Sequence, residues 1–380
     1  MWAVRWLYFF FFAAFSIFVT FGNVYFREIG LTGTEIGLIN TVAPLMGMVS
    51  GPLWGVLSDR FRNPRLFLGI AVLGATAAVL SISLTTSLAG ITLTLAAYWL
   101  FASAFVPLID SITLSLLGGN QDRYGRQRVW GSLGYIAGSW LFGFILQQSG
   151  LHALFYGCAA GMLLMLPGLA FLKAQPPPLQ NAPRAGFAQF IRQPPWLLFA
   201  LSLIVIGIVN NAMNNFLGIY IKELNGSEAL IGSSAALAVL TELPVMYFSS
   251  YFLRRLGNRG MIALGFGFFA VRMLLYGLIP APGWVLAIAL AHGFTYAPFW
   301  VGSVSYASEL APENLKATTQ GMLAFIVGLS GVISGPINGG LYDWLGSARL
   351  FLVNGVLAVA ALVVLGVGTK RQPKKPGRPV

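Results

Sequence analysis

PLIDSITLSLLGGNQDRYGRQRVWGSLGY, residues 107–135, contains two apolar runs separated by a Gly-Gly-Asn break at 118–120. The first run carries Asp110, and Arg128 stands at the start of the second. If both runs are helices that fold back near Gly119, Asp110 and Arg128 lie level with each other across the hairpin. Asp110 precedes the break by seven residues, which is roughly 10 Å along a helix. The segment therefore predicts an acid and a base side by side within a helical hairpin.

The composition places this hairpin in a lipid bilayer. Of 380 residues, 57% are hydrophobic and 9% are charged, and the mean hydropathy is +0.77, whereas soluble domains carry about 25% charged residues. Apolar runs long enough to cross a bilayer, about 20 residues each, recur along the whole chain. The runs are continuous rather than alternating, which indicates helices and not a barrel. Ionisable groups at this depth are costly and usually functional.

We expect an all-α integral membrane fold with twelve transmembrane helices in two pseudo-symmetric six-helix halves. The predicted spans are 5–26, 34–58, 66–86, 89–117, 127–147, 151–172, 196–220, 229–253, 260–279, 283–307, 317–338 and 349–369. A segment rich in proline and alanine, residues 173–195, reads as a linker between an N-terminal half, 1–172, and a C-terminal half, 196–369. Residues 370–380 form a basic tail.

Basic residues fall mainly on one side of the predicted membrane. They are concentrated in the even-numbered connections and the tail, whereas the odd-numbered connections hold only Arg27, Lys222 and Arg349. The positive-inside rule therefore predicts a multi-pass protein of the cell inner membrane whose termini and 173–195 linker are cytoplasmic. Because this bias explains the net charge of +12, we expect the bilayer and not nucleic acid as the partner of these bases.

The two halves repeat each other in sequence. RQRVWGSLGYIAG at 126–138 aligns without gaps with KATTQGMLAFIVG at 316–328, an offset of 190 residues. Parallel repeats of this kind are typical of transporters that hold their substrate between the halves near the midplane of the membrane.

A loop motif resembles the major facilitator superfamily. GVLSDRFRNPR, residues 55–65, is similar to the superfamily signature between its second and third helices, a glycine followed by Asp-Arg and further bases. The resemblance implies that Gly55, Asp59 and Arg60 help to lock one conformation of a gate. A solvated basic loop would explain the arginines but not the aspartate.

Within that superfamily the chain is most similar to the sugar/proton symporters and the phenylpropionate permeases, over nearly its full length. YGRQRVWGSLGY, residues 124–135, looks like the start of their fifth helix. The resemblance implies that Asp110 and Arg128 bind substrate hydroxyls and that Tyr135 stacks on the substrate. Arg272 and His292, twenty residues apart, match an arginine and a histidine that these symporters use in proton coupling. Their proton-carrying glutamate, however, is replaced here by Thr295.

Glu242 is therefore our candidate for the coupling carboxylate. It lies fourteen residues from Glu228 and twelve from Arg254, so we expect it near the midplane, at the depth of Arg272 and His292. A nearby arginine would favour the ionised form of a carboxylate in hydrocarbon. A purely structural ion pair, and a packing role for His292, are the alternatives.

Two further patterns concern the C-terminal half. VNNAMNNF, residues 209–216, places four amides within one span, where they either join helices or bind a polar ligand. We expect Asn211, Asn214 and Asn215 to line the substrate site. GVISGPINGG, residues 331–340, resembles a drug-antiporter motif but lies in the eleventh span instead of the fifth. We interpret it as close helix packing through small residues.

These features predict a transporter and not an enzyme. The sequence contains no phosphate loop, nucleophile triad or Cys/His metal cluster, so we expect no cofactor, no bound metal and no catalytic residue. The leading hypothesis is a monomeric, proton-coupled symporter that takes up a sugar, nucleoside or aromatic acid by alternating access. The alternative is a proton-driven efflux antiporter for drugs or metabolites. A receptor or polytopic enzyme would need an output domain or a catalytic cluster.

Overall fold

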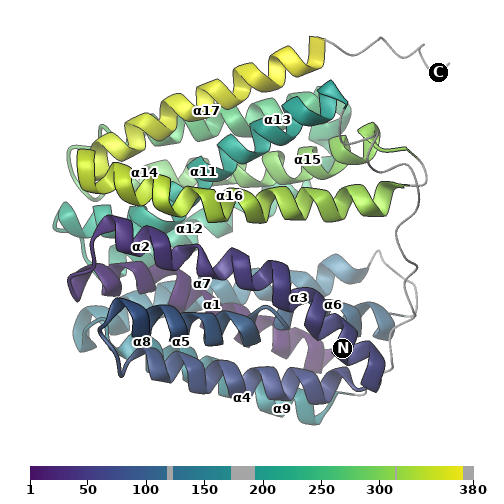
Figure 1. Ribbon diagram of the computed structural model, residues 1–380, viewed down its shortest axis with the longest axis vertical. Helices are drawn as coiled ribbons and strands as arrows, with labels where there is room; N and C mark the ends of the chain where they lie inside the picture. The colour runs from purple at the N-terminus through teal and green to yellow at the C-terminus, as the bar shows by residue number, and fades with distance from the viewer. Residues whose placement is uncertain (118–122, 173–192, 313–314, 371–380) are drawn as a thin grey trace.

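The computed structural model describes residues 1–117, 123–172, 193–312 and 315–370, and within them every regular element is a helix (Figure 1). In chain order the elements are α1 (Trp2–Glu28), α2 (Gly33–Asn40), α3 (Val42–Phe61), α4 (Pro64–Ile82), α5 (Leu88–Ala102), α6 (Phe105–Leu116), α7 (Tyr124–Ser149), α8 (Ala153–Leu163), α9 (Met165–Ala170), α11 (Pro194–Glu223), α12 (Glu228–Tyr247), α13 (Ser249–Tyr276), α14 (Trp284–Ala289), the 3₁₀ helix η2 (Leu290–Phe294), α15 (Tyr296–Leu310), α16 (Lys316–Leu345) and α17 (Ser347–Lys370).

Together these helices make twelve stretches long and apolar enough to cross a membrane, six on each side of 173–192. The predicted all-α fold of twelve spans is thus confirmed. The Gly-Gly-Asn break at 118–120, most of the 173–195 linker and nearly all of the basic tail lie outside the described residues, so the domain boundaries stay predictions.

Four of the spans consist of successive helices, and in a fifth, α13, the helix is interrupted at Gly257, whose φ is 68°. The second, fourth and sixth spans change helix at Thr41, at Ser103–Ala104 and at Leu164, and the tenth runs through η2. Such breaks interrupt the regular backbone hydrogen bonds and are tolerated at membrane depth where other protein groups surround them. The break at η2 becomes part of the candidate site described below.

Short turns of glycine and capping residues close the helices at one end of the bundle. Gly30, Gly150 and Gly346 follow helices with positive φ angles of 99°, 83° and 78°, which glycine adopts without steric cost. Thr32 and Glu35 form a reciprocal capping box at the start of α2. We call this the glycine-turn end. The opposite end, which carries Met1 and the arginines of 60–65 and 123–128, is the Arg-rich end.

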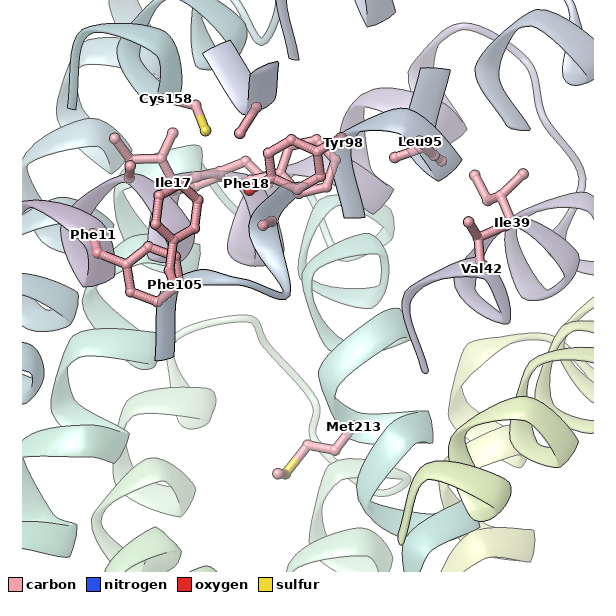
Figure 2. Packing of buried hydrophobic residues seen from close by; sticks show 14 of the residues in the cluster. Phe11, Ile17, Phe18, Ile39, Val42, Leu95, Tyr98, Phe105, Cys158 and Met213 are labelled. Atoms are coloured by element: carbon pink, nitrogen blue, oxygen red, sulfur yellow. The ribbon is translucent and has the colours of Figure 1, made fainter. Parts of the chain in front are cut away.

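The interior of the N-terminal half is built from aromatic rings. Figure 2 shows Phe11, Phe18, Tyr98, Phe105 and Cys158 gathered in one cluster. The ring centroids of Phe11 and Phe105, and those of Phe18 and Tyr98, are 4.8 Å apart, a spacing typical of favourable aromatic contact. Cys158 is a free, fully buried thiol in this cluster. The rigid packing fixes α1 against the rest of its half.

The two halves are in backbone contact near the glycine-turn end and diverge towards the Arg-rich end (Figure 1). A Cβ atom on Gly335 of α16 would meet the carbonyl oxygen of Gly37 in α2, and one on Gly339 would meet that of Gly33. The segment 331–340 therefore does pack closely through small residues. A second close approach joins α7 and α12, where Gly232 faces the Ser139 carbonyl.

Asp343, the acid near the end of α16, caps α2 across the boundary between the halves. Its carboxylate accepts hydrogen bonds from the backbone N–H groups of Gly33 and Thr34, both at 2.7 Å, and from the Thr34 hydroxyl at 2.6 Å. The first N–H groups of a helix have no partner within it, and a carboxylate there also interacts favourably with the helix dipole. These contacts hold the glycine-turn end closed.

Replacing Asp343 with alanine should loosen this closure. The substitution leaves two α2 N–H groups without acceptors, which costs about 1 kcal/mol in the closed state. A cysteine introduced in the cavity should then react faster with a membrane-impermeant thiol reagent added from the glycine-turn side. Thr34→Val removes only the hydroxyl contact and should produce a smaller increase. Equal labelling in Asp343→Ala and the parent would show that the cap does not hold the gate.

Candidate functional site

A cavity of about 830 Å³ lies between the two halves. Its wall includes eight of the nine residues predicted for substrate binding or proton coupling: Arg128, Tyr135, Asn211, Asn214, Asn215, Glu242, Arg272 and His292. They come from α7, α11, α12, α13 and η2, so both halves contribute. Asp110 is the exception, because it does not line the cavity.

Asp110 and Arg128 do not form the predicted ion pair within the described part of the chain; Tyr8 of α1 connects them instead. The Tyr8 hydroxyl donates a hydrogen bond of 2.5 Å to the Asp110 carboxylate. The Arg128 guanidinium lies over the rings of Phe12 and Tyr8, at 4.2 and 5.5 Å from their centroids, as in cation–π contacts. The expectation was wrong because α6 and α7 scarcely touch and α1 packs against α7. Asp110 is therefore linked to Arg128 through Tyr8 and does not contact the cavity itself.

Arg272 is surrounded by neutral polar groups in the cavity wall. One terminal nitrogen lies 2.9 Å from Nδ1 of His292 and 3.0 Å from the Thr295 hydroxyl, and the other donates to the Tyr276 hydroxyl at 3.0 Å. Arg272 is only 1% exposed, and its Nε has no hydrogen-bond partner. The predicted proximity of Arg272 and His292 is thus present in the structure.

The helical break of the tenth span creates this arrangement. In η2 the Thr295 hydroxyl donates to the carbonyl of His292 at 2.6 Å, and the Gly293 N–H donates to the Thr241 hydroxyl at 3.2 Å. A Cβ on Gly293 would collide with the Thr241 carbonyl, so only glycine lets α12 approach here. The tight turn directs His292 and Thr295 towards Arg272.

Glu242 faces Arg128 and not the predicted partners Arg272 and His292. In the antiparallel pair α7 and α12, Gly232 contacts Ser139 and Gly143 contacts the carbonyl of Glu228. The same register, extended towards the Arg-rich end, places Glu242 opposite position 129. Arg128 accordingly acts electrostatically on Glu242. Glu242 and Arg272 form no ion pair among the described residues, although both line the cavity.

The asparagines of α11 join a chain of amides that crosses between the halves. The Asn23 side chain donates to Asn215 at 3.4 Å, and the Asn40 side chain donates to Asn23 at 3.1 Å. Asn211 instead donates to the carbonyl of Gly207 in its own helix at 2.8 Å. The sequence analysis missed Asn23 and Asn40, although both also line the cavity. An isolated amide within an apolar run was the signal that could have revealed them.

The predicted gating motif lies away from the cavity. Gly55, Asp59 and Arg60 occupy the last two turns of α3 at the Arg-rich end. The helix ends at Arg62, whose φ of 50° is left-handed. The side chain of Asp59 is not among those described, so the gating role stays a prediction.

Comparison with known proteins assigns the family. The model of the MFS_1 like family matches residues 1–353. The chain belongs to this family. It is 28% identical to a maltose permease of Geobacillus stearothermophilus, with 96% of this chain and 93% of the relative covered. It is 26% identical to a probable 3-phenylpropionic acid transporter of Escherichia coli (strain K12), with 96% of each chain covered.

Solved structures share the fold of this family member. The nucleoside transporter NupG has a TM-score of 0.83 at 15% identity, with 97% of this chain and 99% of NupG covered. An auto-inhibited peptide transporter of the POT family has a TM-score of 0.76 at 14% identity, covering 100% and 99%. The resemblance to the major facilitator superfamily is therefore confirmed, and the chain is a multi-pass membrane transporter rather than an enzyme.

Proposed function

We propose that the chain is a secondary transporter that imports a small polar or aromatic solute together with protons, by alternating access. The observation that carries this proposal is the cavity of about 830 Å³ between the halves, lined by both, with the halves in backbone contact at one end. A substrate held there contacts both halves, so a rocking motion between them can expose it to either side in turn. Because one chain contains both halves, a single copy is sufficient for this cycle.

Proton coupling is assigned to Glu242. Within the described residues it is the one acid that lines the cavity. Arg128 lies opposite Glu242 on the other half, so a movement of the halves changes the distance between this carboxylate and a positive charge, and with it the affinity of the carboxylate for a proton. Proton binding at Glu242 is thereby linked to the relative position of the halves.

The residues that line the cavity suit a solute that has both polar groups and a planar ring. Amides of α11 lie on one side of the cavity, while Tyr135, Tyr296 and Trp300 provide aromatic surface. The rings of Tyr296 and Trp300 are nearly parallel, with 4° between their planes. A sugar and an aromatic acid both suit such walls, and the relatives named for maltose and 3-phenylpropionic acid are consistent with either.

Export is the second candidate function. The chain is 25% identical to the multidrug resistance protein MdtG of Serratia proteamaculans (strain 568), over 82% of this chain and 76% of that protein. A drug exporter would use the same cavity but move the solute against the direction of proton entry.

Reconstitution into proteoliposomes tests the function directly. A thermal-shift screen of the purified protein with maltose, nucleosides and 3-phenylpropionate selects a ligand. Uptake of that ligand is then measured with an imposed pH gradient. Accumulation on the alkaline side, abolished by a protonophore, is expected for symport. Accumulation on the acidic side would establish antiport, and absence of any gradient-driven flux would refute secondary transport with protons.

Both termini should face the cytoplasm, because basic residues are concentrated at the Arg-rich end. Alkaline phosphatase fused after Gln372 should be inactive in a bacterial host, because the enzyme folds only outside the cytoplasm. A matched fusion after Asn225, in a turn at the glycine-turn end, should be active. The reverse pattern would overturn the proposed orientation.

A further inference from the structure

Among the residues that the structure describes, Arg272 is a buried cation without a counter-charge. All its hydrogen-bond partners in the described chain are neutral groups: the His292 ring and the hydroxyls of Thr295 and Tyr276. The side chain is 1% exposed and Nε is unpartnered. A buried charge is normally paired, because the loss of hydration is otherwise uncompensated.

Arg128, the other arginine in the cavity wall, differs in this respect. Its guanidinium lies on the π faces of Phe12 and Tyr8, and Tyr8 is in turn hydrogen-bonded to Asp110. Glu242 lies opposite it on α12 and interacts with its charge. The described acids near the cavity are therefore associated with Arg128, and none is left for Arg272.

We propose that the missing counter-charge of Arg272 is a carboxylate of the transported solute, which makes the substrate an aromatic carboxylate and not a neutral sugar. Arg272, Tyr276 and His292 all line the cavity, so a carboxylate there can accept from the guanidinium and the Tyr276 hydroxyl. Arginine presents a planar fork of donors suited to this group. This inference deepens the proposed function and rests on it.

The remaining wall suits the body of such a molecule. Tyr296 and Trp300 follow η2 directly in α15 and present parallel rings with centroids 6.2 Å apart. Trp99 and Tyr135 contribute aromatic surface from the opposite half. An aryl ring can therefore pack between the halves while its carboxylate reaches Arg272. Because Arg272 is almost fully buried, the side chains that cover its guanidinium must move aside before a carboxylate can reach it.

Matched acids and amides test the inference by binding alone, without transport. Isothermal titration of the detergent-purified protein would compare benzoate, phenylacetate and 3-phenylpropionate with their primary amides, which keep the shape but lose the charge. At least one acid should bind roughly 100-fold more tightly than its amide, the effect expected when one partner of a buried charge pair is removed. Equal affinities, or no binding by any acid, would overturn the proposal.

Substitutions of the two cavity arginines identify which one binds the carboxylate of the solute. Arg272→Gln should abolish the preference for the acid, and Arg272→Lys should retain part of it. Arg27→Gln, an arginine substitution outside the cavity wall, is the control that should keep the preference, and Arg128→Gln tests the competing anchor. Melting curves show whether each variant is folded. If Arg272→Gln keeps the preference and Arg128→Gln loses it, the proposal is wrong and Arg128 is the anchor. If Arg272→Gln does not fold, Arg272→Lys replaces it in the test. A reduced preference of Arg272→Lys for the acid supports the proposal, and an unchanged preference contradicts it.

The two proposals fail in different ways. Arg272-dependent acid binding with no proton-driven flux would refute the transport function and leave the carboxylate site intact. Proton-driven uptake of maltose that no acid inhibits would refute the carboxylate site and leave the transport function intact.

Discussion

Leucine in place of Gly335 should abolish transport across the membrane. A Cβ at this position would overlap the carbonyl oxygen of Gly37 and lie 2.8 Å from Cγ2 of Thr41. Gly37 lies in α2 and Thr41 directly follows that helix, so both obstacles are on the other half, and a backbone carbonyl within a helix cannot swing aside. Overpacking of this kind costs about 3 kcal/mol, enough to reduce the population of the closed state roughly 100-fold. The cavity should then stay open at the glycine-turn end.

The matched control for this variant lies one and a half turns further along the same helix. A Cβ on Gly340 of α16 meets nothing within 4 Å, so Gly340→Leu adds the same bulk to α16 without touching α2. We would compare uptake in proteoliposomes and reaction of a cysteine introduced at Asn40 with an impermeant thiol reagent. The native Cys158 is fully buried and gives little background. Similar uptake and labelling in the two leucine variants would show that the glycine contact is not the gate.

The sequence predicted how deep in the membrane the site residues lie better than it predicted which neighbours their side chains face. Counting residues from helix ends brought Glu242, Arg272 and His292 to one cavity, because the rise of a helix is constant. The same counting paired Glu242 with Arg272, whereas the structure places it opposite Arg128. Depth does not determine which helices are neighbours, or which face each one presents.

The sequence also could not predict that α1 contributes Tyr8 and Phe12 to the surroundings of Arg128, because it does not show which helices are neighbours. The hairpin of 107–135 suggested direct contact between Asp110 and Arg128, but Tyr8 and Phe12 lie between or beside them. These two aromatics occur in an apolar run where every residue is equally compatible with lipid. Only the packing of α1 distinguishes Phe12, which lines the cavity, from Tyr8, which is fully buried in the core.

The break at η2 was equally hidden. Gly293 allows α12 to approach, and Thr295 then bonds back to the His292 carbonyl. In the sequence analysis, Thr295 was noted only because it stands where the similar symporters have a glutamate. In the structure the Thr295 hydroxyl accepts a hydrogen bond from Arg272, so a neutral group stands where those symporters have a carboxylate.

Glu242→Gln should abolish uphill accumulation and retain exchange. Glutamine has nearly the shape of the protonated acid and cannot release a proton, so the variant mimics the permanently protonated state. If Glu242 carries the coupling proton, the loaded protein can still reorient with substrate bound. It cannot return empty in the deprotonated form, and net proton-driven uptake stops. Accumulation should therefore fall to the equilibrium level, while counterflow should stay close to that of the parent.

Two assays on one batch of proteoliposomes separate these effects. Uptake under an imposed pH gradient reports coupled transport, and counterflow of labelled against unlabelled solute at equal pH reports exchange alone. Glu228→Gln is the matched control, because Glu228 begins the same helix, pairs with Lys222 at 2.7 Å and does not line the cavity. It should preserve both activities, since an ion pair near the membrane surface contributes little. A Glu242→Gln variant that still concentrates solute would mean that this carboxylate only balances the charge of Arg128, and that the proton is carried by another group.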